Sequence, residues 1–110
     1  GKTQEDEEQL IRDAIAVEKA GAFSIVVEGV KSDVAKKITQ AVNIPIIGIG
    51  AGGGVDGQVL VLHDMVGLTQ DFSPRFLRRY ADVQGIMNEA IGQYVTDVKS
   101  GDFPNESEQY

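Results

Sequence analysis

Apolar residues recur with a helical period over the first 20 residues of the chain. Four of them fall on one stripe: Leu10, Ile11, Ala14 and Ile15. Thr3 is a suitable N-cap, and the acidic residues 5–8 fill the first turn, where the helix dipole favours negative charge. The pattern therefore predicts a helix over residues 3–20 that stops at Gly21.

Two short apolar runs, residues 23–27 and 44–49, are typical of strands that are buried on both faces. Between them the pattern predicts a helix over residues 33–42, with Ser32 as its cap. Four residues of this helix should face inward: Val34, Ala35, Ile38 and Val42. The run 59–62 fits either a third strand or part of a buried helix, and its two valines favour the strand.

The last predicted helix begins at Ser73 as cap and Pro74 as first residue, because proline suits the first helical position. Its apolar face extends from Phe76 to Val98, and Gly101 should end it. Residues 101–110 form a polar tail, which should be loosely held after Phe103-Pro104.

The alternation of helices and strands predicts an α/β fold with parallel strands and right-handed crossovers. The order starts on a helix, and strands that are apolar throughout need neighbours on their edges. A chain of 110 residues is too short for a closed eight-stranded barrel, which typically takes about 250. We therefore expect the chain to be the end of a larger structure.

Composition excludes several classes of function. Hydrophobic residues make up 42% of the chain and charged residues 25%, which is typical of a globular protein. The absence of cysteine excludes disulfides and thiolate metal sites, and it fits a cytoplasmic protein. A net charge of −7 argues against nucleic acid or anionic membranes as partners.

Glu28 is the first candidate for chemistry, since it ends an apolar strand-like run and precedes Gly29. In βα folds the carboxyl ends of the strands form the functional rim. A glutamate there would be partly desolvated and would suit a general base. The alternative is an ordinary solvated acid at a strand end.

The glycine-rich loop 48–54 is the second candidate, because Gly48, Gly50 and Gly53 match the dinucleotide-binding spacing G-x-G-x-x-G. A true fingerprint needs a helix that starts within the loop. Here the apolar run 59–62 follows instead, and a ribose-binding acid would fall near Asp71 rather than at a strand end. A tight turn with close backbone approach explains the glycines equally well.

The remaining polar residues have simpler explanations. His63 and Asp64 are adjacent and do not face each other, and a lone histidine in an apolar run is usually a packing residue. Lys36-Lys37 and the arginines at 75, 78 and 79 form small basic clusters on predicted helices. Solvated faces or interface contacts account for them without a phosphate.

The segment GIGAGGGVDGQVLVLHDMVGL, residues 48–68, resembles the hallmark segment of the ketopantoate hydroxymethyltransferases. Four further segments resemble the same family in its order: EKAGAFSIVVEGV (18–30), VAKKITQAVNIPIIGIG (34–50), SPRFLRRYAD (73–82) and VKSGDFP (98–104). The chain departs from the family at Lys31, where proline is usual, and its loop 52–54 is richer in glycine.

The resemblance implies that residues 1–110 are the carboxyl-terminal part of a single (β/α)₈ TIM barrel whose amino-terminal half is absent. It also implies a one-carbon transfer from 5,10-methylenetetrahydrofolate to 3-methyl-2-oxobutanoate, giving ketopantoate for pantothenate synthesis. Glu28 matches the family's proton acceptor. Mg²⁺ should bind in the absent half, together with the substrate-contacting serine, lysine and histidine, so no metal ligand is assigned here.

The resemblance further implies a homo-oligomer, which in the family is a decamer, or a partner that supplies the missing half of the barrel. The 110-residue chain alone should then be inactive. Two other hypotheses stay open at this stage. The chain could be a non-catalytic βα fragment that acts in association, or a nucleotide-phosphate binder that uses residues 48–54.

Overall fold

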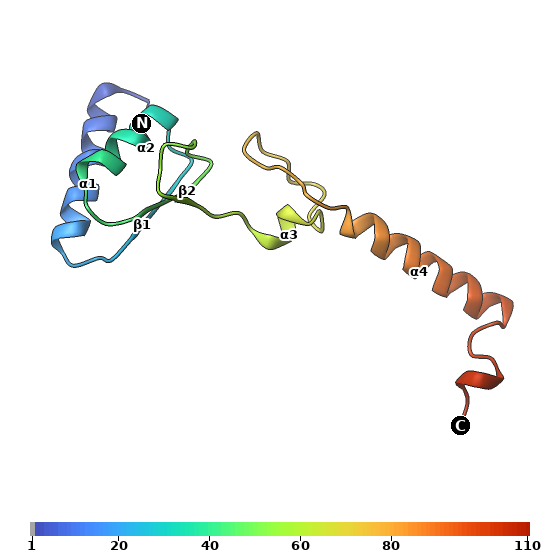
Figure 1. Ribbon diagram of the computed structural model, residues 1–110. Helices are drawn as coiled ribbons and strands as arrows, with labels where there is room; N and C mark the ends of the chain where they lie inside the picture. Colours follow the sequence, from blue (N-terminus) through green and yellow to red (C-terminus); the bar gives the residue numbers. More distant parts are fainter. Residues whose placement is uncertain (1) are drawn as a thin grey trace. The chain divides into compact units, whose positions relative to one another are not determined.

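A computed structural model describes residues 2–110, which form two compact units (Figure 1). Unit 1 comprises residues 2–60 and 74–77, and unit 2 comprises residues 61–73 and 78–110. The elements of unit 1 are α1 (Gln4–Lys19), β1 (Ile25–Glu28), α2 (Ser32–Ala41), β2 (Ile46–Ile49) and β3 (Gly57–Gln58). Those of unit 2 are α3 (Leu62–Met65), α4 (Val83–Ser100) and the 3₁₀ helix η1 (Glu106–Glu108).

Unit 1 contains a parallel sheet of three strands in the order β1-β2-β3. Ile25 pairs with Ile46 and Glu28 with Ile49, so β1 and β2 are in register along their whole length. The expected α/β class with parallel strands is therefore confirmed for this unit. A closed barrel is not seen in these residues.

The hydrophobic core of unit 1 lies where α1 and α2 pack against each other and against the sheet (Figure 1). All four residues expected on the inner face of the second helix are buried: Val34, Ala35, Ile38 and Val42. Ala14 contributes from α1, Val27 from β1 and Ile46 from β2. Burial of branched side chains at these positions holds the two helices on the strands.

The start of each helix in unit 1 depends on how its first N–H groups are satisfied. Thr3 caps α1 as predicted, because its hydroxyl accepts a hydrogen bond from Asp6 N at 3.1 Å. The prediction that Ser32 caps α2 is wrong, because the helix begins at Ser32 itself. Lys31 is the residue before it, and its carbonyl accepts from Ala35 N at 2.9 Å.

The run 59–62 is neither a third strand nor a buried helix. The third strand occupies Gly57–Gln58, just before it, and Val59 N donates the last bond of the ladder to Gly48 O. Pairing stops there because β2 ends at Ile49 and Gly50 turns the backbone away with a φ of 61°. Val59 and Leu62 are exposed, and Leu62 already begins α3.

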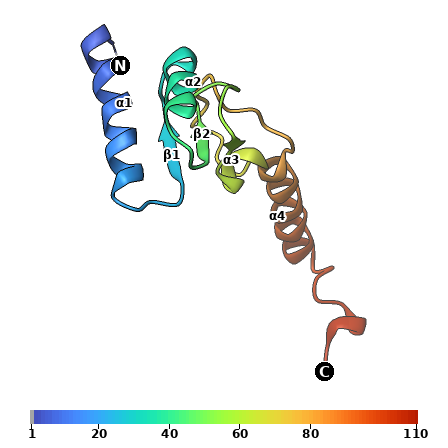
Figure 2. The same ribbon diagram turned by 60° about the vertical axis from the view of Figure 1, so that its left-hand side comes forward.

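The last helix begins nine residues later than Ser73–Pro74 predicts, since α4 starts at Val83 with Asp82 as its cap. Segment 73–82 contains no helix (Figure 2), and hydrogen bonds from Arg79 and Tyr80 hold its second half. The Arg79 guanidinium donates to Thr69 O at 3.0 Å and to Phe72 O at 2.8 Å, and Tyr80 N donates to Met65 O. Gly101, at φ 81°, ends α4 as predicted.

The tail after α4 is more ordered than expected. Asn105 caps η1 through Ser107 N, and Phe103 meets Tyr94 edge to face with ring centroids 5.4 Å apart. None of the helices in residues 2–110 is both long and apolar enough to cross a membrane.

Candidate functional site

Glu28 is the last residue of β1, at the carboxyl edge of the sheet. It pairs with Ile49, the last residue of β2, and Gly29 N extends the ladder by donating to Ile49 O at 2.9 Å. The backbone of Glu28 is thus fixed by the neighbouring strand on one side. This is the position that the sequence predicts for a functional acid in a βα fold.

The side chain of Glu28 points to the sheet face opposite the core. Side chains alternate along a strand, and Val27 is buried against the helices whereas Val26 is 62% exposed. Paired residues of parallel strands share a face, so Glu28 lies with Val26, Ile47 and Ile49. A carboxylate is therefore placed at the end of an apolar strip.

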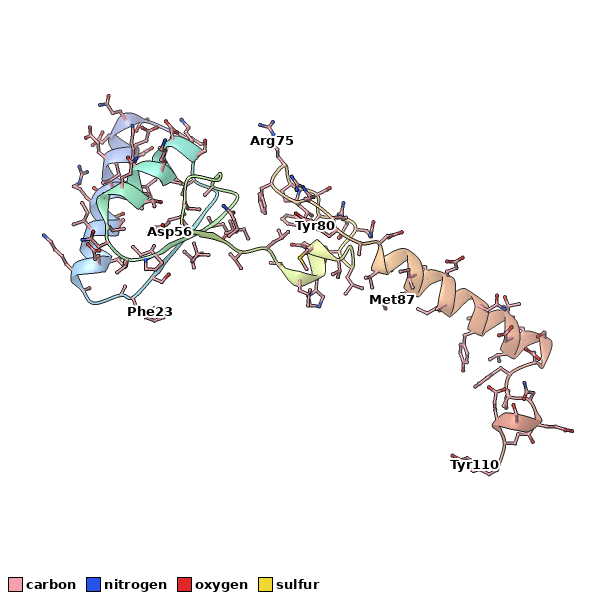
Figure 3. The ribbon with its side chains drawn as sticks, viewed as in Figure 1. Phe23, Asp56, Arg75, Tyr80, Met87 and Tyr110 are labelled. Carbon is pink, nitrogen blue, oxygen red and sulfur yellow. The ribbon has the colours of Figure 1, made fainter. Side chains whose placement is uncertain are left out.

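Glu28 is exposed in unit 1, rather than partly shielded as expected. The same is true of the strand around it, since the expected burial of 23–27 on both faces is not observed. Among the described residues β1 pairs with β2 alone, so its outer edge and one face have no cover. Phe23, on the turn before β1, is 88% exposed and points away from the unit (Figure 3).

An open groove of about 280 Å³ follows the free edge of β1. Its lining is almost entirely apolar: Leu10, Asp13, Ala14, Val17, Ile25, Val26, Val27, Glu28, Val30 and Ile38. Glu28 and Asp13 are the only carboxylates among the described residues that line it. The groove thus places one strand-end carboxylate beside an apolar surface.

The glycine-rich loop does not form a dinucleotide-binding turn. Residues 50–56 contain no helix and return directly to β3, which pairs in parallel with β2. A helix N-terminus for a pyrophosphate is therefore missing from the loop itself. This outcome agrees with the expectation, drawn from the apolar run that follows, that no helix starts within the loop.

Close backbone packing accounts for two of the glycines. A Cβ atom at Gly52, where φ is 80°, would overlap Ser32 and lie 3.1 Å from the Ser32 Cα. A Cβ at Gly50 would lie 2.8 Å from the Phe76 Cδ1. The loop therefore rests on the start of α2 on one side and on the Phe76 ring on the other.

Asp56 fastens the end of the loop to the start of β2 (Figure 3). Its carboxylate accepts from Ile46 N at 2.8 Å, and its own N–H donates to Ile46 O at 3.0 Å. The Gln58 amide donates to Gly52 O at 2.8 Å. These bonds tie the loop 50–56 to the sheet at Gly52 and Asp56.

His63 and Asp64 are in unit 2, on α3. His63 is exposed, and Asp64 is 8% exposed. Within residues 2–110 the structure brings together no group of three His, Cys, Asp or Glu residues that could hold a metal ion.

One basic residue, Arg75, lies outside the helix in which the sequence placed it. Arg75 and Phe76 are not helical, and with the loops after β1 and β2 they line a second open groove, of about 440 Å³. Lys31 lines the same groove. In the sequence, the one feature that could have drawn attention to this groove was Lys31, because the family usually has proline at that position.

Comparison with known proteins gives one consistent result. A family model described as ketopantoate hydroxymethyltransferase matches residues 1–106. The 3-methyl-2-oxobutanoate hydroxymethyltransferase of Aliarcobacter butzleri is 69% identical over 110 residues, which are 100% of this chain and 41% of that protein. The proteins of the same name from Flavobacterium johnsoniae and Porphyromonas gingivalis are 58% and 51% identical, each over 99% of this chain and 40% of their own length. The chain thus spans about two fifths of these curated relatives.

Proposed function

Because the chain belongs to the ketopantoate hydroxymethyltransferase family, we propose that the full-length protein containing it makes ketopantoate. The substrates are 3-methyl-2-oxobutanoate and 5,10-methylenetetrahydrofolate. The C3–H bond of the keto acid and the two C–N bonds of the folate's methylene bridge break, and a bond forms from C3 to the one-carbon unit. Water supplies the hydroxyl group, and the protons released from C3 and from water end on the two folate nitrogens. Tetrahydrofolate is the other product. The relatives carry the name of this activity, which supports the proposal.

Within this reaction we assign Glu28 the removal of the C3 proton. The supporting observation is its position as the last residue of β1, on the sheet face opposite the core. The pairing of Glu28 with Ile49 and the bond from Gly29 N hold its backbone, so the carboxylate has a fixed starting point. A positioned carboxylate of this kind typically contributes about 10²–10⁴-fold to a proton transfer.

The architecture proposed for the full-length protein is a (β/α)₈ barrel in which β1 and β2 are neighbouring strands. The parallel register and the placement of both helices on one face of the sheet support this arrangement. In such a barrel the face that carries Val26 and Glu28 points inward and a further strand covers the free edge of β1. We also propose Mg²⁺ as the cofactor, with ligands outside these 110 residues, and a homo-oligomer as the assembled form.

Exchange of the substrate's C3 proton with D₂O tests the role of Glu28 without the folate. In the full-length protein, Glu28→Gln should lower the exchange rate by about 10²–10⁴-fold, because the amide keeps the shape but cannot take a proton. Glu89→Gln, which removes an exposed acid from α4, is the control and should exchange at the wild-type rate. Proton NMR follows the loss of the C3 signal.

Two outcomes would contradict the assignment. If Glu28→Gln exchanges at the wild-type rate while ketopantoate formation collapses, Glu28 acts in the folate half of the reaction. If both rates stay near wild type, Glu28 is an ordinary solvated acid.

A further inference from the structure

The second groove of unit 1 lies on the carboxyl side of β1 and β2. The described residues that line it are Val30, Lys31, Ser32, Gly50, Gly52, Arg75 and Phe76. The first three follow β1, and the two glycines follow β2. The groove is therefore on the same side of the sheet as Glu28, two residues beyond it along the chain.

The charge of this groove is opposite to that of the chain. Lys31 and Arg75 contribute two positive charges, and none of the described lining residues is acidic, in a chain with a net charge of −7. Lys31 Nζ lies 3.8 Å from Glu7 Oε1, and because the lysine side chain is 56% exposed this long contact contributes little. Arg75 has no hydrogen bond or ion pair within residues 2–110, and its side chain extends into open space (Figure 3).

The base of the groove is rigid. The Phe76 ring packs against Gly50, and Gly52 packs against Ser32, with no room for a side chain at either glycine. Ala51, between the two glycines, is 1% exposed. Two exposed cationic side chains thus border a closely packed floor of backbone and one aromatic ring, which is an arrangement suited to an anion.

We propose that this groove binds the glutamyl tail of the folate co-substrate, through Lys31 and Arg75. The inference rests on the proposed function and identifies where that co-substrate is held. The carboxylates of a folate are separated from its one-carbon unit, which bridges N5 and N10, by the p-aminobenzoyl group. A cationic surface on the same side as Glu28, but beyond it, is therefore where the tail belongs. Without these two charges the acidic chain would repel a polycarboxylate.

The number of glutamyl residues on the folate is the variable that tests this proposal. In the full-length protein the KM for triglutamyl methylenetetrahydrofolate should be lower than for the monoglutamyl form. Lys31→Ala and Arg75→Ala should each raise the triglutamyl KM by roughly two- to fivefold, as for a solvent-exposed ion pair, and leave kcat and the keto-acid KM unchanged. Lys37→Ala removes an exposed lysine of α2 that does not line the groove and should change nothing.

Calorimetric titration with triglutamyl tetrahydrofolate measures the same effect without turnover. The proposal is overturned if tail length has no effect in the wild type, or if both variants bind mono- and triglutamyl forms like the wild type. It is also overturned if pyrophosphate competes with the tail and tail length does not matter, because the groove is then a phosphate site. If the protein lacks transferase activity but binds the tail through Lys31 and Arg75, the proposed function fails and the groove assignment stands.

Discussion

Substitution of Gly52 by alanine tests whether the glycine-rich loop is built for close packing rather than for a ligand. Two separate penalties apply at this position. A φ of 80° places an L-residue in the left-handed region, which costs roughly 1–2 kcal/mol. The new methyl group would also overlap Ser32, and overpacking of this kind costs about 1–3 kcal/mol. Gly52→Ala should therefore lower the free energy of unfolding by about 2–5 kcal/mol.

Gly53 provides a matched control from the same loop. A Cβ atom there meets nothing within 4 Å, and its φ is not in the left-handed range. Gly53→Ala should change the free energy of unfolding by no more than about 0.5 kcal/mol. Both variants replace a glycine of the same loop by alanine. The change in composition and in the entropy of the unfolded loop is therefore the same for both, and it cancels when their free energies of unfolding are compared.

Thermal unfolding of the full-length variants measures the difference, and amide exchange at Val59 localises it. Gly52→Ala should melt at least about 4 °C below the wild type, with faster exchange at Val59, whose N–H closes the ladder on Gly48. Gly53→Ala should match the wild type in both measurements. Equal losses for the two variants would refute the packing explanation of the loop.

Two further predictions concern the start of α4 and the uncovered strand β1. Asp82→Ala should destabilise α4 by about 1 kcal/mol, because Asp82 Oδ1 accepts a hydrogen bond from Gly85 N at 3.1 Å, whereas Asp82→Ser should retain the cap. Circular dichroism on heating distinguishes the two variants, and identical unfolding curves would rule out the capping role. The 110-residue chain should self-associate in sedimentation velocity through the uncovered edge and face of β1, and Val26→Lys should reduce this more than the control Thr96→Lys. A monomer at all concentrations would contradict the second prediction.

The pattern of apolar residues was sufficient to predict the helices whose inward positions repeat along a single element. The inward positions of α2 follow the helical period and are buried. In the α1 stripe Ala14 is buried, whereas Leu10, Ile11 and Ile15 are partly buried against the core. The strand-end position of Glu28 was also predictable, because it needs only the end of an apolar run. The exposure of the Glu28 side chain could not be predicted, because it depends on which strands cover β1.

The errors arise where tertiary contacts override local signals. Ser73-Pro74 is a good helix start, yet the packing of Phe76 on Gly50 and the carbonyl bonds of Arg79 hold this segment outside a helix. Val59 has a high strand propensity, but β2 turns away at Gly50 and leaves it no partner strand. Neither contact partner can be identified from spacing along the chain.

The hydrogen bonds between Asp56 and Ile46 have a consequence for the kinetics of binding. They anchor the far end of the glycine-rich loop, and the bonds from Val59 to Gly48 and from Gln58 to Gly52 secure the rest of it. A loop tied to its own strand at several points cannot swing as a hinged lid. Capture of a ligand in the neighbouring groove would then need only side-chain rotation, which takes picoseconds to nanoseconds, and diffusion rather than loop closure would limit its rate.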